Sequence, residues 1–260
     1  MGRVNPQRVH CILLAGLVTA TALLALSPSY AQSPDASESN AASPFGPSMH
    51  DNRLYTHLLF DELEGRLGST DSFRWDGEAW IGTDTNRLWI KSEGFAMHGG
   101  VEDGVQELLY DRPISPFFDV QGGVRYDLDS LPGRGWAALG VQGLAPYLFE
   151  LSATLYARDA GHFAARLQAS YDELLTQRLI LQPLVEINAY TRPDPVRDVG
   201  AGLSDIDAGL RLRYELSRKF APYLGVTYQR SYGPRSRSAG VAPWGSVHTW
   251  RLAIGMRTCL

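Results

Sequence analysis

Apolar and polar residues alternate with a period of two in one segment after another between residues 73 and 257. In the first clear segment, Phe73 and Trp75 occupy one face of an extended chain while Asp76 and Glu78 occupy the other. The same alternation recurs in the segments 118–128, 149–158, 205–216 and 249–257. Such a period predicts β-strands with one apolar and one polar face, and it argues against helices.

The faces predict twelve strands, most of them about ten residues long, the length with which a tilted strand crosses a bilayer. We expect them near 54–66, 73–82, 87–96, 105–111, 117–128, 135–144, 147–157, 163–172, 178–190, 204–216, 220–231 and 247–260. Short connections such as 83–86 and 217–219 alternate with longer ones such as 191–203 and 232–246. Bacterial outer-membrane barrels have an even strand number, short periplasmic turns and long outer loops.

The first 53 residues lack this pattern. Residues 1–31 combine a basic start with the apolar run 11–26 and small residues before the expected cleavage point, which predicts an export signal. A membrane anchor is the alternative, but the apolar run is short for one. Residues 32–53 are rich in Ser, Ala and Pro and predict a periplasmic linker. Removal of the signal would leave Cys259 as the only cysteine, so we expect no internal disulfide.

Two architectures fit two-faced strands. A soluble sandwich or barrel turns the apolar faces inward, whereas an outer-membrane barrel turns them toward lipid and lines a wet interior with the polar faces. The export signal, the strand length and the mixture of bulky residues with Gly and Ala on the apolar faces favour the membrane. We therefore predict an all-β fold, a transmembrane antiparallel up-and-down β-barrel of about twelve strands over residues 54–260.

Charged residues on the polar faces are expected to line the lumen, because an outward Arg or Lys at mid-bilayer costs about 2–4 kcal/mol. The predicted lumen residues are Asp76, Glu78, Lys91, Glu93, Asp119, Arg125 and Asp127. Pairing of opposite charges on facing strands would seal a narrow barrel, which is the role we expect. Coordination or guidance of cations is the alternative.

Methionine and histidine occur together at two places, Met49-His50 and Met97-His98, and His57 follows the first pair. A thioether is a soft ligand that favours Cu(I), and imidazole accepts both copper oxidation states. All five residues are therefore candidate metal ligands, with coincidence in a linker or a polar loop as the alternative. The expected topology puts the first pair at the periplasmic end and the second in an outer loop. Strict alternation directs His57 outward, unless a β-bulge reverses it.

Several stretches in order along the chain resemble the copper resistance protein B family, the CopB or PcoB type. They are "MHDN" (49–52), "WDGEAWIGTDTNRLWIKSEG" (75–94), "ISPFFDVQGGVRYDL" (114–128), "YDELLTQRLILQP" (171–183) and "FAPYLGVTYQRSYG" (220–233). Two features are unusual, the first for the family and the second for outer-membrane barrels in general. Residues 32–48 contain no Met or His, where many members carry a Met- and His-rich repeat, and the chain ends in "RTCL" rather than an aromatic residue.

The resemblance implies an outer-membrane barrel of a Gram-negative cell that binds copper, Cu(I) and/or Cu(II), and protects against copper excess by sequestration or export. It implies contact with outer-membrane lipid and a periplasmic copper carrier or oxidase of the same resistance system as a partner. The N-terminal segment is expected in the periplasm. No nucleic-acid partner is expected, because the net charge is −4 and no basic block is present.

Two other functions remain as alternatives. One is a small porin without metal specificity, although a lumen filled with charge pairs would be narrow for that role. The other is an outer-membrane hydrolase, which needs a nucleophile and a base within hydrogen-bond reach. No spacing in the sequence singles out such a pair, so we expect no enzymatic activity.

Overall fold

The computed structural model describes residues 53–260, apart from 69–70, 98–99, 129–132, 194–199 and 233–246. The predicted signal (1–31) and nearly all of the predicted linker lie outside the described residues and remain predictions. Met49, His50 and His98 lie outside them as well.

The alternating sequence folds into strands. These are β1 (Tyr55–Leu67), β2 (Ser72–Gly82), β3 (Arg87–Met97), β4 (Gly100–Pro113), β5 (Phe118–Asp127), β6 (Arg134–Ala145), β7 (Phe149–Ala157), β8 (Phe163–Ser170), β9 (Glu173–Leu174), β10 (Leu179–Tyr190), β11 (Gly202–Tyr214), β12 (Phe220–Ser231) and β13 (Val247–Cys259). Two 3-10 turns, η1 (Pro146–Leu148) and η2 (Asp159–Gly161), lie in connections. Across the described part of the chain, no helix is long and apolar enough to cross a membrane.

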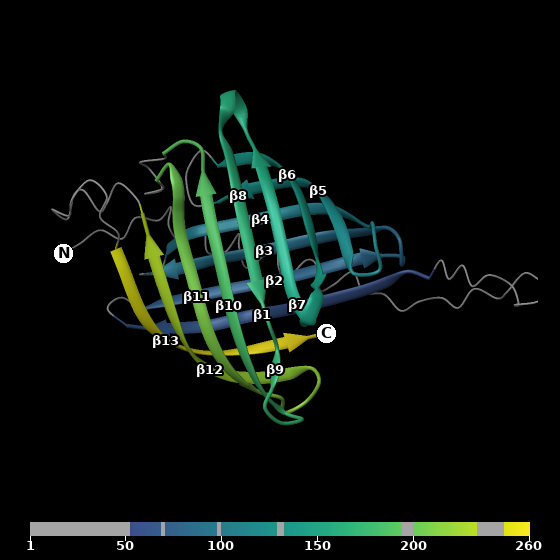
Figure 1. The fold of residues 1–260 in the computed structure, drawn as a ribbon, viewed down its shortest axis with the longest axis vertical. Coiled ribbons are helices and arrows are strands. Elements are labelled where there is room, and N and C mark those ends of the chain that lie inside the picture. Colours follow the sequence, from purple (N-terminus) through teal and green to yellow (C-terminus); the bar gives the residue numbers. More distant parts are fainter. Residues whose placement is uncertain (1–52, 69–70, 98–99, 129–132, 194–199, 233–246) are drawn as a thin grey trace, which may run out of the picture. The chain divides into compact units, whose positions relative to one another are not determined.

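The strands form one closed antiparallel barrel. Each long strand pairs with its neighbours along the chain, and β13 pairs with β1 to complete the ring. The two-residue β9 pairs with β10 beyond the end of β8, so β8 and β9 share one position in the wall. The described barrel wall therefore consists of twelve strand positions. Figure 1 shows β7, β8, β10 and β11 crossing one wall of the barrel, with β1 to β4 behind them. The predicted twelve-stranded up-and-down topology is confirmed.

Burial is inverted relative to a soluble protein. Large apolar residues such as Leu139, Leu155 and Trp250 are more than 60% exposed, at 61%, 63% and 64%. Charged residues such as Arg66 and Asp127 are fully buried, at 0%. An outward apolar band around a polar interior is the arrangement that a bilayer requires of a barrel. The fold is therefore a transmembrane β-barrel, as the sequence predicts.

The connections at the end of the barrel where β1 begins and β13 ends, which we call the terminal rim, are short. They include 83–86 between β2 and β3 and 215–219 between β11 and β12. The opposite end, the far rim, carries longer connections such as 191–201 and 232–246. The two longest connections thus lie at one end of the barrel, as the sequence predicts, but that end also carries short connections such as 98–99.

Two local features differ from the prediction. The strand expected at 105–111 begins at Gly100, so the connection after Met97 is only two residues and not an extended outer loop. The second difference is a β-bulge in β1, where the register with β2 shifts between Phe60 and Glu62. The extra residue, Asp61, reverses the direction in which every preceding side chain of β1 points.

Candidate functional site

The lumen contains a cluster of ion pairs that connects opposite walls. From β1, the Arg66 guanidinium donates through Nε to Glu64 Oε1 and through Nη1 to Asp207 Oδ2 on β11, both at 2.6 Å. From β2, Arg74 Nη2 donates to Glu186 Oε2 on β10 at 3.1 Å. These strands are not sheet neighbours. The side chains therefore meet across the interior rather than along the wall.

A second arginine on β11 extends this cluster. Arg211 lies 2.9 Å through Nη2 from Glu62 Oε1 and donates from Nε to Glu64 Oε2 at 3.1 Å. Tyr223 on β12 donates its hydroxyl to the same carboxylate oxygen at 3.0 Å. Glu64 thus receives donors from three strands. These donors offset the free-energy cost of burying the Glu64 carboxylate, because a buried charge without partners is strongly destabilising.

The middle of the barrel is crossed at two further places. Arg166 on β8 pairs with Glu93 on β3, and the hydroxyl of Tyr156 on β7 donates to Glu107 on β4 at 2.7 Å. The guanidinium carbons of Arg66 and Arg74 both lie over the Phe95 ring, at 5.0 and 4.8 Å from its centroid. Such cation–π contacts add to the ion pairs. Side chains from non-adjacent strands therefore contact one another across the lumen.

The residues predicted to line the lumen all lie on the inner faces of their strands. Lys91 donates to Gln121 at 3.2 Å and to Gln142 at 3.0 Å. Arg125 Nε donates to Asp127 at 2.8 Å, and Asp127 also accepts a bond from Trp136 Nε1 at 2.9 Å.

The remaining predicted lumen residues follow the same inner faces. Asp119 pairs with Arg87 at 3.1 Å, and Glu93 is the partner of Arg166 described above. In the register of the wall, Asp76 lies opposite Glu93 and Glu78 lies opposite Lys91. The lumen residues predicted from the sequence do not include Arg66, Arg74, Glu186 and Arg211, although the same alternation places these four on polar faces.

His57 lies inside the barrel, and the expectation that strict alternation directs it outward is wrong. The bulge at Asp61 shifts the phase, so His57 pairs in register with Trp80 on the inner face of β2. The two rings stack, with centroids 5.9 Å apart and an interplanar angle of 25°. His57 Nε2 lies 3.3 Å from Cys259 Sγ on β13. The bulge thereby brings the imidazole to a thiol that sequence reasoning did not select.

Met97 is the last residue of β3, at the far rim, where it pairs with Gly100. His57 lies at the opposite end of the barrel, so the two do not belong to one site. Among the described residues, no group of three or more His, Cys, Asp or Glu side chains is placed to hold a metal ion. Of the five candidate ligands, the structure describes His57 and Met97, and these two are separate. Among the described residues, Cys259 is a further soft ligand beside His57.

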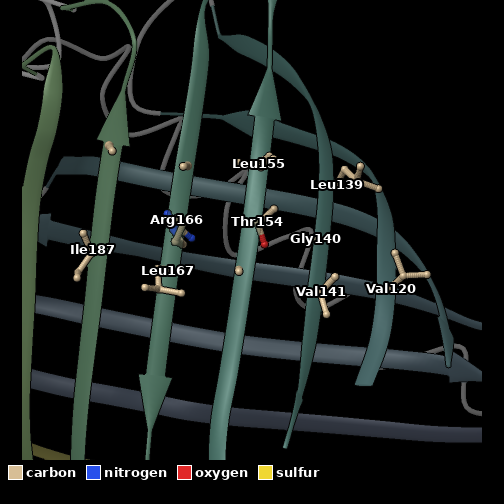
Figure 2. A pocket seen from close by; sticks show the side chains of 12 residues that line it. Val120, Leu139, Gly140, Val141, Thr154, Leu155, Arg166, Leu167 and Ile187 are labelled. Atoms are coloured by element: carbon tan, nitrogen blue, oxygen red, sulfur yellow. The ribbon is translucent and has the colours of Figure 1, made fainter. Parts of the chain in front are cut away.

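The outer wall carries a shallow apolar hollow of about 520 Å³ over β5 to β8 and β10 (Figure 2). Its outward lining is aliphatic: Val120, Leu139, Val141, Ala153, Leu155, Ala165, Leu167, Ile187 and Ala189. It forms where small alanines lie between larger neighbours on the lipid-facing side. None of the candidate metal ligands lines the hollow.

Comparisons with known proteins agree with the resemblance in the sequence. The family model described as copper resistance protein B precursor (CopB) matches residues 54–259. Copper resistance protein B of Escherichia coli is 45% identical over 195 residues, which is 75% of this chain and 66% of that protein. The copper resistance protein B homolog of Pseudomonas syringae pv. tomato is 41% identical over 213 residues, 82% of this chain and 72% of that protein. The chain thus spans about two thirds of the E. coli relative.

Among solved structures, the similarity is to porins at low sequence identity. The NanC porin is 11% identical, with a TM-score of 0.48 over 78% of this chain and 99% of that chain. The KdgM porin is 10% identical, with a TM-score of 0.44 over 78% of this chain and 98% of that chain. The barrel assignment of this chain stands on its own strand pairing.

Proposed function

The chain belongs to the copper resistance protein B family, and from that premise we propose that it retains copper at the outer membrane rather than conducting it freely. The family match over the whole barrel supports a role in copper resistance and a location in the outer membrane. The direction of copper movement, by sequestration or by export, is the finer question. The ion pairs that cross the lumen are the observation that favours sequestration.

The cross-lumen ion pairs oppose an open channel. Passage of a hydrated ion would require separation of Arg66 from Asp207, of Arg74 from Glu186 and of Arg166 from Glu93. Breaking one buried pair so that a charge is left without a partner costs about 3–5 kcal/mol. A general porin, the alternative function, would need a lumen without these contacts. Any export of copper through this barrel would need them to rearrange.

We also propose that the terminal rim faces the periplasm, because short connections lie on that side in bacterial barrels. Met49 and His50, which precede β1 in the sequence, would then receive Cu(I) or Cu(II) on the periplasmic side. A periplasmic copper carrier or oxidase of the same resistance system is the partner that this arrangement suits. Lipid surrounds the apolar wall.

Two measurements test the proposal together. A strain that lacks the gene should grow at lower copper concentrations than its parent, and the restored gene should recover growth. The purified protein in a planar bilayer should show little ion conductance, because ion pairs cross the lumen. Unchanged copper tolerance would refute the role in resistance. Steady, large conductance without selectivity for copper would favour the porin instead.

A further inference from the structure

His57 and Cys259 lie together at the terminal rim, on the two strands that close the barrel. Both side chains are half-buried, and His57 Nε2 is 3.3 Å from Cys259 Sγ. We propose that this pair is a binding site for a soft monovalent cation, Cu(I), at the mouth of the barrel. The inference rests on the proposed function and names a ligand pair for it.

The local fold holds the two ligands in register. Leu59 pairs with Cys259 between β1 and β13, and Leu58 and Leu260 exchange two backbone hydrogen bonds at 3.3 and 2.9 Å. The pairing thus extends to the end of the chain and fixes Cys259. The bulge at Asp61 then turns His57 to the same inner side.

The geometry suits a metal ion between the two atoms. Protein metal–sulfur and metal–nitrogen bonds of about 2.3 and 2.0 Å, taken at the tetrahedral angle, separate sulfur from nitrogen by about 3.5 Å. The observed 3.3 Å needs only a small adjustment. Thiolate and imidazole are both ligands that copper accepts, and thiolate selects Cu(I). On binding, the sulfur–copper bond replaces the sulfur–hydrogen bond and one proton is released to solvent.

The surroundings leave the imidazole available for a metal. His57 Nδ1 is buried and has no hydrogen-bond partner, so the ring is held by its stack on Trp80 and by the contact of Nε2 with Cys259 Sγ. Trp80 in turn lies 6.1 Å from Trp89, and Arg87 lies over Trp80 at 5.4 Å. The wall beside the pair is therefore aromatic, and water competes poorly for a soft ion there.

The coordination would be incomplete, which distinguishes this site from a store. Among the described residues, no third His, Cys, Asp or Glu joins the pair. Two ligands leave positions open for a ligand from outside, so an ion can enter and leave by exchange. A transfer site needs this property, and a closed four-ligand site lacks it.

The experiment uses the full purified chain in detergent with Met49→Ala and His50→Ala introduced, so that the N-terminal candidates do not contribute. Cu(I) is titrated under reducing, oxygen-free conditions, and the reaction of the Cys259 thiol with a disulfide reagent is followed. We expect Cu(I) to slow this reaction strongly. His57→Phe, which keeps the stack on Trp80, should weaken Cu(I) binding by about tenfold or more, a loss of about 1.4 kcal/mol.

Cys259→Ser should abolish the ultraviolet thiolate–Cu(I) absorption, whereas His162→Phe, at a partly exposed position near the far rim, should change nothing. A heat-modifiable band verifies that each variant is folded. Equal Cu(I) affinity in the parent and in Cys259→Ser, with a thiol equally reactive with and without Cu(I), would mean that the contact is only a structural hydrogen bond. That result would leave the growth phenotype of the deletion strain intact, so it separates failure of this site from failure of the proposed function.

Discussion

Replacement of Arg66 by methionine should test whether the cross-lumen ion pairs stabilise the folded barrel and restrict ion conductance. The methylene stem of methionine retains much of the packing, but the guanidinium is lost from between Glu64 and Asp207, each 2.6 Å away. A third carboxylate, Glu62, lies 3.9 Å from Nη2. All four side chains are at most 5% exposed, so water cannot replace the lost donor.

The expected destabilisation follows from the charges left behind. Removal of one partner of a buried ion pair costs about 3–5 kcal/mol, because the remaining charge is uncompensated. With urea slopes of about 1–3 kcal/mol/M, the unfolding midpoint should fall by at least about 1 M. The cation–π contact with Phe95 is lost as well, which acts in the same direction.

The assay is urea unfolding of the refolded barrel in detergent, with ion conductance measured in parallel. Arg218→Met, at an exposed position in the connection after β11, is the matched control and should shift stability by no more than about 0.5 kcal/mol. The double variant Arg66→Met with Asp207→Asn should lose less than the sum of the single losses, since the two residues interact. A midpoint for Arg66→Met equal to that of Arg218→Met, with unchanged conductance, would refute the reasoning.

Three further outcomes are expected. Gly123→Ala should destabilise the barrel by about 1–3 kcal/mol, because a Cβ there would lie 2.1 Å from a backbone carbonyl oxygen of β4, whereas Gly135→Ala meets nothing within 4 Å and should be neutral in the same unfolding assay. Met49→Ala with His50→Ala should remove most of the copper affinity of the N-terminal segment without loss of the heat-modifiable band; equal copper affinity would mean that this pair is a coincidence. Deletion of Asp61 should remove the bulge and direct the imidazole of β1 toward lipid, so Cu(I) should no longer protect the thiol; retained protection would contradict the assigned register.

The sequence predicts the wall of this barrel better than its interior. Alternation is local, so the pattern around Phe73 or Val124 suffices to assign a strand and the face of each residue. It cannot tell which inward residues meet across the lumen, and the pairing of Arg66 with Asp207, 141 positions away, emerges only when the wall is closed. The lumen residues predicted from the sequence accordingly include charged residues of the inner face but miss Arg66, Arg74 and Arg211.

The interpretation of His57 failed for a different reason. A single extra residue in β1 changes the phase of all that precede it, and no strong sequence signal marks Asp61 as that residue. Cys259 was missed because its significance depends on this bulge and on the pairing of the first strand with the last. The alternation of apolar and polar residues cannot predict a site that depends on a β-bulge and on the pairing of the first strand with the last.

The pairing of β1 with β13 also has a kinetic consequence. It joins Leu59 to Cys259, so the chain that it closes is about 200 residues long, whereas each hairpin of the wall closes across fifteen residues or fewer. Loop closure costs about 5 kcal/mol of entropy for 200 flexible residues and about 1.4 kcal/mol for five. Hairpins should therefore form first, and the pairing of β1 with β13, the seam of the barrel, should form last. Folding should be slow for a chain of this length. Until the seam forms, β1 and β13 are unpaired edges, and shielding of the Cys259 thiol would mark the moment at which they disappear.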